Sequence, residues 1–273
     1  MKLITMIILA VGSCVPQIEP TIESKYETFS SSDLSDLEDS LKSRSSWSKA
    51  IRFNVYAAPT KLEALTDLAG NYTPEEVGTN LVFTPDKGFK GQGISNPDSY
   101  IDTKVVPMIT GNPPIYTALS FDNVTYGVYI IDPPSSSVGV KYLFGAVDDS
   151  DRQWFAYIDQ GKTYYTTCDD AIINESSGHI AEGLHVFKQD DNYSEYYKIS
   201  GPSSFDDVDD PNLIENVSIY DLWANLDLNS DGVSGKSFDG YIAVSFVYEY
   251  LTDSEVDAIK DDIENYLTLI GAI

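Results

Sequence analysis

A calcium-loop pattern spans residues 227–232, which read DLNSDG. Carboxylate and amide oxygens at alternate positions can converge on one hard cation, and the glycine permits the sharp turn that such a loop needs. The twelfth position of the pattern is Phe238 instead of a bidentate Glu, which excludes a full EF-hand. The spacing therefore predicts a Ca²⁺ site formed by Asp227, Asn229 and Asp231. The alternative is an ordinary hairpin loop, in which the same residue types are common.

Aromatic side chains are concentrated in the middle of the chain. Exposed aromatic rings can stack on the apolar faces of sugars, while neighbouring carboxylates and amides bind the sugar hydroxyls. This pattern predicts a ligand-binding surface that contains Trp154, Tyr157, Tyr164 and Tyr165. The alternative is that rings on strands pack in the core or form cross-strand pairs.

The residue patterns of hydrolases are weak in this sequence. A retaining glycosidase needs two carboxyl groups about 5 Å apart, but the acidic runs at residues 148–151 and 206–210 lie among Ser, Pro and Gly, as solvated loops do. The chain has two histidines, and His185 lies in an apolar run that is typical of a strand. The sequence therefore predicts a protein that is not an enzyme, with a glycoside hydrolase as the alternative.

The N-terminus combines an apolar run at residues 3–10 with small residues and Cys14. This arrangement resembles a bacterial lipoprotein signal, in which Cys14 becomes the lipidated first residue. The alternative is a retained arm that docks on a neighbouring subunit, because the run is rich in β-branched residues. Residues 1–30 are thus predicted to form a signal or arm followed by a polar tether, and residues 31–273 a single domain.

The overall composition excludes several classes of protein. The chain carries 43 acidic and 17 basic residues and has a net charge of −26, which opposes binding to nucleic acid or to an anionic membrane surface. Hydrophobic residues make up 42% and aromatic residues 12% of the chain, which is too much for a disordered acidic tail. No apolar run is long enough for a transmembrane helix.

Strands are the elements that must position these candidate residues. Short apolar and aromatic runs alternate with turn clusters rich in Pro, Gly, Asn and Asp. Strand-length runs at this spacing favour an all-β sandwich or barrel over alternating α/β units. The predicted strands lie at residues 51–56, 81–83, 116–121, 124–131, 140–147, 154–158, 164–165, 185–188, 195–199, 217–220 and 240–250.

Helices are predicted towards both ends of the domain. Leucines at spacings of three and four predict a helix at residues 32–43, with a capping box between Ser35 and Glu38. A shorter helical segment is predicted at residues 62–68, ended by Gly70.

The final helix has the clearest pattern. Thr252 and Glu255 form a capping box at its start. The residues that follow form an apolar stripe that should pack on a sheet, namely Val256, Ile259, Ile263, Leu267 and Ile270.

The order of these elements resembles a known fold. The last strand and helix resemble the closing segment of concanavalin A-like, or laminin G-like, jelly rolls. Further segments are similar to the version of this fold found in virion and tail-associated proteins of bacteriophages; they lie at residues 47–49, 57–59, 63–65, 80–84, 88–93 and 99–103. The resemblance implies an all-β, two-sheet antiparallel jelly-roll sandwich with a short N-terminal helix and a C-terminal amphipathic helix.

The same resemblance implies a function. It predicts a structural protein at the virion surface or tail, which contacts other virion subunits or its own copies and adheres to host-surface glycan. The lipoprotein interpretation of Cys14 gives the alternative, an exported bacterial protein anchored in the outer membrane and carrying a glycan-binding module. Calcium is the one cofactor that the sequence predicts.

Overall fold

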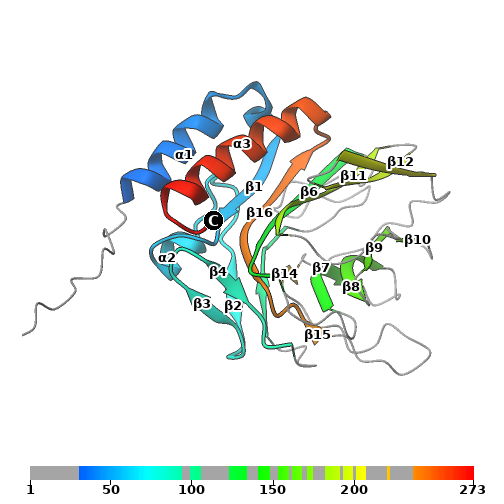
Figure 1. Ribbon diagram of the computed structural model, residues 1–273, viewed down its shortest axis with the longest axis horizontal. Helices are drawn as coiled ribbons and strands as arrows, with labels where there is room; N and C mark the ends of the chain where they lie inside the picture. Colours follow the sequence, from blue (N-terminus) through cyan, green and yellow to red (C-terminus); the bar gives the residue numbers. More distant parts are fainter. Residues whose placement is uncertain are drawn as a thin grey trace, which may run out of the picture.

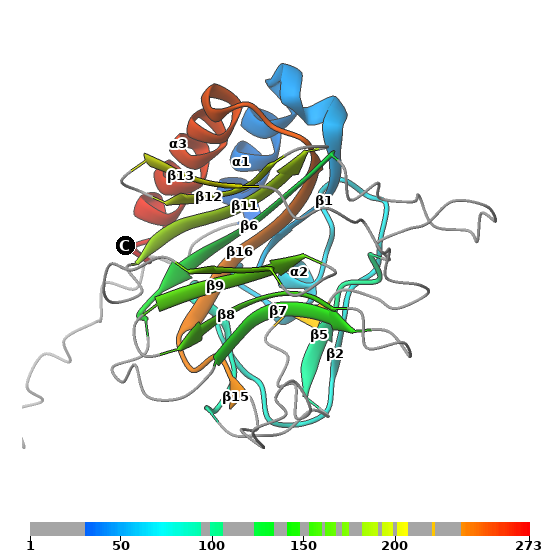
Figure 2. The same ribbon diagram turned by 90° about the vertical axis from the view of Figure 1, so that its right-hand side faces the viewer.

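A computed structural model describes residues 31–93, 99–105, 123–133, 141–147, 153–159, 162–167, 171–174, 182–190, 193–198, 201–206, 220–221 and 236–273. In this part of the chain the strands form two sheets of eight strands each. Two helices lie together on one side of the pair of sheets (Figures 1 and 2). The predicted all-β sandwich with a helix near each end is confirmed.

Sheet A contains the longest strands of the described chain. Its strands run in the order β13-β12-β11-β6-β16-β4-β3, with β1 also paired to β16. They are β1 (Ala50–Val55), β3 (Val82–Thr84), β4 (Gly88–Lys90), β6 (Asn123–Ile131), β11 (Gly183–Asp190), β12 (Tyr193–Lys198), β13 (Gly201–Asp206) and β16 (Tyr241–Glu249). All of these pairings are antiparallel.

Sheet B faces the inner side of sheet A. Its strands run in the order β10-β9-β8-β7-β14-β5-β2, and β15 pairs in parallel with β7. They are β2 (Glu75–Val77), β5 (Tyr100–Asp102), β7 (Lys141–Val147), β8 (Gln153–Asp159), β9 (Lys162–Thr167), β10 (Ala171–Asn174), β14 (Tyr220–Asp221) and β15 (Lys236–Ser237).

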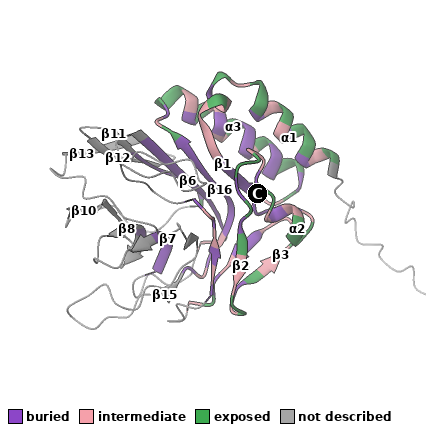
Figure 3. Cartoon of the chain, turned by 180° about the vertical axis from the view of Figure 1, so that it is seen from behind, coloured by how far each residue is buried: buried purple, intermediate pink, exposed green. Residues whose placement is uncertain are grey.

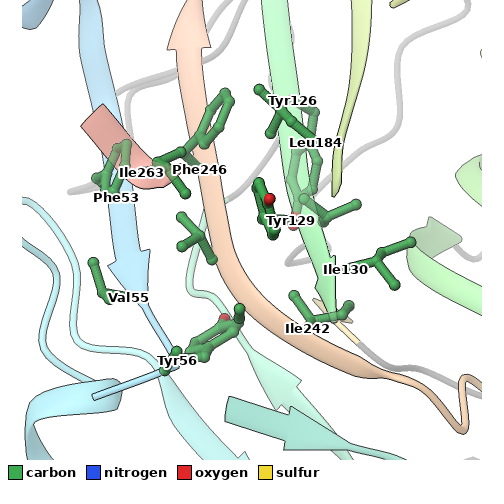
Figure 4. Close-up of a cluster of buried hydrophobic side chains, with 14 of the residues drawn as sticks. Phe53, Val55, Tyr56, Tyr126, Tyr129, Ile130, Leu184, Ile242, Phe246 and Ile263 are labelled. Atoms are coloured by element: carbon green, nitrogen blue, oxygen red, sulfur yellow. The ribbon is translucent and has the colours of Figure 1, made fainter. Parts of the chain in front are cut away.

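The helices α1 (Ser31–Ser43) and α3 (Asp253–Leu269) cover the outer side of sheet A. The predicted apolar stripe of α3 and the leucines of α1 are buried, and Figure 3 shows the buried residues on the facing sides of the helices and the sheet. Beneath the helices, Phe53 of β1 stacks on Phe246 of β16 with ring centroids 5.5 Å apart. Figure 4 shows both rings close to Ile263 of α3. A continuous apolar layer therefore joins the helices to the sheet.

Capping boxes mark the starts of two of the helices. The capping box between Thr252 and Glu255 at the start of α3 is confirmed. The predicted capping box at Ser35 is wrong, because α1 begins at Ser31 and Ser35 lies inside the helix. The predicted helix at residues 62–68 is shorter and is preceded by a capping box of its own, between Thr60 and Glu63 at the start of α2 (Lys61–Ala64).

A buried carboxylate ties α1 to α3. Asp262 of α3 accepts two hydrogen bonds from the guanidinium of Arg44, at 2.7 and 2.9 Å, and one from the hydroxyl of Ser40 at 2.9 Å. The pair of charged groups is bidentate, which fixes the relative position of the helices. Within the described ranges, no helix is long and apolar enough to cross a membrane.

Candidate functional site

The two faces of sheet B are distinguished by Phe144 and Ala156. Phe144 of β7 stacks on Tyr126 of β6, with ring centroids 4.0 Å apart, so it lies between the sheets. Ala156 of β8 pairs with Phe144 and is also buried. Since successive residues of a strand point to opposite faces, these two residues show which register positions face sheet A.

A row of tyrosine positions crosses the opposite, outer face of sheet B. Tyr157 of β8 pairs with Tyr164 of β9, and Tyr142 of β7 pairs with Tyr157. Tyr157 directly follows Ala156, so this position and the positions paired with it are on the face that is turned away from sheet A. A bulge in β7 between Tyr142 and Phe144 shifts the alternation, which puts Tyr142 on the same face as Tyr157. Helices α1 and α3 lie beyond sheet A, on the side opposite this face (Figure 1). The row is therefore the main candidate for a ligand-binding surface.

The other two predicted binding residues occupy the opposite face. Tyr165 pairs directly with Ala156, and Trp154 precedes Ala156 by two residues on β8. Both positions are therefore on the side of sheet B that faces sheet A. The register brings Tyr157 and Tyr164 together but separates them from Trp154 and Tyr165.

The β7 end of the row is buried. Tyr142 is only 3% exposed, and Gly145, further along β7, is also buried. The β7 end of the row is thus covered. The candidate contact positions are those on β8 and β9.

Charged groups lie at the β2–β5 edge of the same outer face. Glu75 and Asp102 pair in register, and the ammonium of Lys104 lies 2.7 Å from the Asp102 carboxylate and also contacts Glu75. Asp102 in turn pairs with Tyr220, which pairs with Gly145 of β7. Sequence reasoning missed this cluster because its members lie on short strands that are far apart in the chain.

A second polar cluster, around Arg52, is enclosed between the sheets. Arg52 is fully buried and donates hydrogen bonds to the hydroxyls of Tyr56 and Tyr126, each at 3.1 Å, to Asn54 Oδ1 at 3.2 Å, and to Ser245 Oγ. The apolar and polar residues alternate at residues 51–56, which predicts a half-buried strand with Arg52 and Asn54 on its exposed face. That prediction is wrong, because the helices cover one face of β1 and sheet B the other. The cluster is a structural part of the core.

The remaining predicted site residues have different outcomes. The proposed calcium ligands Asp227, Asn229 and Asp231, and the candidate lipidation residue Cys14, lie outside the described residues. Among the residues that are described, no group of three or more His, Cys, Asp or Glu side chains could hold a metal ion. The apolar run around His185 predicts a half-buried strand residue; His185 does lie on a strand, β11, but it is buried.

Calcium binding by residues 227–231 stays a prediction with a direct test. If the loop binds Ca²⁺, calcium at about a hundredfold excess over its dissociation constant stabilises the fold by about 2.7 kcal/mol. The melting temperature should then rise on adding calcium and fall again with a chelator. Asp231→Asn should reduce the rise, whereas Asp39→Asn on the exposed side of α1 should not. An unchanged melting temperature would contradict the calcium site.

The two sheets and their helical cover define a jelly-roll sandwich. Among solved structures, the chain is similar to Trypanosoma rangeli sialidase in complex with sialic acid, with a TM-score of 0.57 and 14% sequence identity over 86% of this chain. It is also similar to the binding domain of botulinum neurotoxin serotype G, with a TM-score of 0.54 and 13% identity over 79% of this chain. At these identities the similarity shows the fold alone.

The chain corresponds to only part of each of these structures. It spans 38% of the sialidase and 51% of the neurotoxin binding domain. No protein-family model matches the sequence, and no curated protein matches it.

These comparisons correct one prediction. The sequence predicted a protein that is not an enzyme, and this is contradicted because solved structures similar to the chain include several sialidases. The lack of a recognisable carboxyl pair in the sequence is therefore not sufficient ground to exclude an enzyme.

Proposed function

We propose that the chain is a glycan-binding module and that the sugar contacts the outer face of sheet B at β8 and β9. The cross-strand pairing of Tyr157 with Tyr164 carries this proposal. Directly opposed residues on antiparallel strands have Cβ atoms about 4.5–5.5 Å apart, so two such rings can act as one platform. A platform of this kind presents an apolar surface with hydroxyl groups at its rim, which suits a sugar ring.

Trp154 and Tyr165 are not part of the proposed contact surface. Their register positions are on the inward face of sheet B, opposite the face of the tyrosine pair. The charged cluster of Glu75, Asp102 and Lys104 supplies hydrogen-bonding groups at the edge of the same face. A longer glycan could reach these groups from the tyrosines.

The solved structures support a sugar ligand at the level of the fold. One of the similar proteins is a sialidase in complex with sialic acid, and another is described as a binding domain. We propose that this binding serves adhesion to host-surface glycan and that the protein is associated with a virion or its tail. There it would contact other virion subunits or its own copies. An outer-membrane protein lipidated at Cys14 is the alternative context, which palmitate labelling lost in Cys14→Ala would favour.

Removing either ring of the platform should weaken glycan binding. A screen on a glycan array would first identify a ligand. Tyr157→Ala and Tyr164→Ala should then each lower the affinity about tenfold, or about 1.4 kcal/mol, when measured by calorimetry. The same glycans should be assayed for cleavage, because the similar solved structures include sialidases.

Two controls make this test specific. Tyr157→Phe and Tyr164→Phe keep the ring and should retain most of the affinity. Leu62→Ala alters an exposed residue on α2, outside sheet B, and should have no effect. Full affinity in both alanine variants, with the fold intact, would refute the proposed surface.

A further inference from the structure

The lysines of this acidic chain are almost all neutralised by a carboxylate where the structure describes their side chains. The ion pairs are Lys42–Glu38, Lys49–Glu255, Lys61–Glu76, Lys87–Asp132, Lys104–Asp102, Lys141–Asp239, Lys188–Asp253 and Lys260–Glu264. Lys90 differs from these, because among the described residues it has no carboxylate within ion-pairing distance. In a chain with a net charge of −26, an ammonium group without an acidic partner is unexpected.

Lys90 lies over an aromatic ring at one end of sheet A. It is the last residue of β4, and Tyr241 is the first residue of the neighbouring strand β16. The two strands pair at Phe89 and Ile242, so Lys90 and Tyr241 are cross-strand neighbours. The Lys90 Nζ atom lies 4.9 Å from the centre of the Tyr241 ring. The electrons of the ring attract the ammonium group but leave its positive charge uncompensated.

A second ammonium group approaches the same ring. Lys87 Nζ lies 5.7 Å from the centre of the Tyr241 ring and 2.5 Å from a carboxylate oxygen of Asp132. The pKa of Lys87 is raised above its ordinary value, chiefly by this hydrogen bond to Asp132. Lys87 is therefore already paired, and of the two cations at the ring only Lys90 is available to an anion from solution.

The surroundings of the ring carry further polar groups. Tyr241 OH lies 2.9 Å from Thr84 Oγ1, and both residues are half-buried. Together with the exposed carboxylate of Asp132, these hydroxyls can exchange hydrogen bonds with the hydroxyl groups of a ligand. A cation that has no acidic partner in the described part of the chain, an aromatic ring and hydroxyl-binding groups thus meet within one small area.

We propose that Lys90 and Tyr241 form a binding site for an acidic sugar, a monosaccharide unit that carries a carboxylate. The carboxylate pairs with Lys90, the sugar ring contacts the side of Tyr241, and sugar hydroxyls bond to Thr84 and Asp132. A neutral sugar would leave the charge of Lys90 uncompensated. A bulky polyanion would meet the repulsion of the chain's own negative charge, so the site suits a single carboxylate.

This site is independent of the proposed tyrosine platform. Tyr241 and Lys90 belong to sheet A, whereas Tyr157 and Tyr164 belong to sheet B. Binding at either site can therefore fail without affecting the other.

The test uses two free acidic sugars and their neutral derivatives. N-acetylneuraminic acid, glucuronic acid and the methyl ester of each would be titrated into the isotope-labelled protein and followed by NMR. We expect at least one acid to shift the side-chain resonances of Lys90 and Tyr241, and its methyl ester to bind about tenfold more weakly. The acid that binds more tightly identifies the class of sugar.

Variants then assign the charge to Lys90. Lys90→Met keeps most of the side-chain stem and should weaken binding of the acid about tenfold, while Lys90→Arg should restore it. Lys61→Met is a matched control, since Lys61 also lies over an aromatic ring, 5.8 Å from the centre of Phe89, but is paired with Glu76. Its affinity for the acid should equal that of the unmodified protein.

Several results would overturn the proposal. One is equal binding of an acid and its ester, a comparison that needs no variant. Another is unchanged affinity in Lys90→Met. A third is displacement of the sugar by an equal concentration of acetate, which would show that the sugar ring adds nothing to a simple anion contact.

Discussion

Replacing Gly127 with alanine should destabilise the protein by about 3 kcal/mol, at the upper end of what overpacking of a core costs. Gly127 lies on β6 directly opposite Phe246 of β16. A Cβ atom at this position would lie 2.0 Å from Cζ and 2.4 Å from Cε2 of the Phe246 ring. The ring cannot move aside easily, because it stacks on Phe53 and meets Tyr248 edge-on at 5.6 Å, all in the core. Urea denaturation would measure the loss.

A double variant separates this steric clash from other effects. Phe246→Ala alone should cost about 3–5 kcal/mol, as truncation of a buried ring does. When Phe246→Ala is combined with Gly127→Ala, the loss of stability should be clearly less than the sum of the two single losses, because the ring that clashes is gone. Gly70→Ala is a useful comparison, since Gly70 has a φ of +74° and no neighbouring atom within 4 Å. The left-handed backbone should cost an alanine there only about 1 kcal/mol. Strictly additive costs for Gly127 and Phe246 would contradict the clash.

Asp67→Ala should destabilise the protein to a similar extent, although it removes a charged side chain. The Asp67 carboxylate accepts four backbone hydrogen bonds between 2.8 and 3.0 Å, from the N–H groups of Phe53, Ala69, Asn71 and Tyr72. Asp67 is 6% exposed. Its loss leaves backbone donors without acceptors, and each hydrogen bond to a charged group contributes about 1.5–3 kcal/mol. Because water can bind the donors nearer the surface, we expect the free energy of unfolding to fall by about 4 kcal/mol.

The conservative variant tests whether the four hydrogen bonds are the cause. Asp67→Asn keeps one acceptor oxygen and should lose about half as much stability as Asp67→Ala, because its amide group donates instead of accepting. Asp39→Ala removes an exposed carboxylate from α1 and should change the denaturation midpoint very little. Equal midpoints for Asp67→Ala and the unmodified protein would show that Asp67 does not hold this turn.

The longer elements of the fold could be predicted from the sequence, because their patterns repeat over several residues. The strand at 124–131 and the final helix are examples. Strands β2, β4 and β5 contain three residues each, too few for an alternation to be recognised. The inward position of Arg52 could not be predicted either, since it depends on helices and strands from distant parts of the chain covering both faces of β1.

The candidate site was predicted only in part. Tyr164 and Tyr165 are adjacent, so strand alternation alone shows that they cannot share one face. Which of them lies on the outer face depends on the stacking of Phe144 on Tyr126, a contact between two sheets. Lys90 gave no signal in the sequence. That it has no acidic partner among the residues of the described ranges becomes visible only when the partners of the other lysines are known.

The position of β16 has a consequence for how the protein is made. β16 lies between β6 and β1 in sheet A, yet among the described strands it comes last in the chain. Until residues 241–249 have been synthesised, β1 therefore lacks its strand partner, and β6 can pair only with β11. Such intermediates are prone to aggregate, and sheets closed by distant segments fold slowly. Sheet A can thus be completed only after residues 241–249 have left the ribosome.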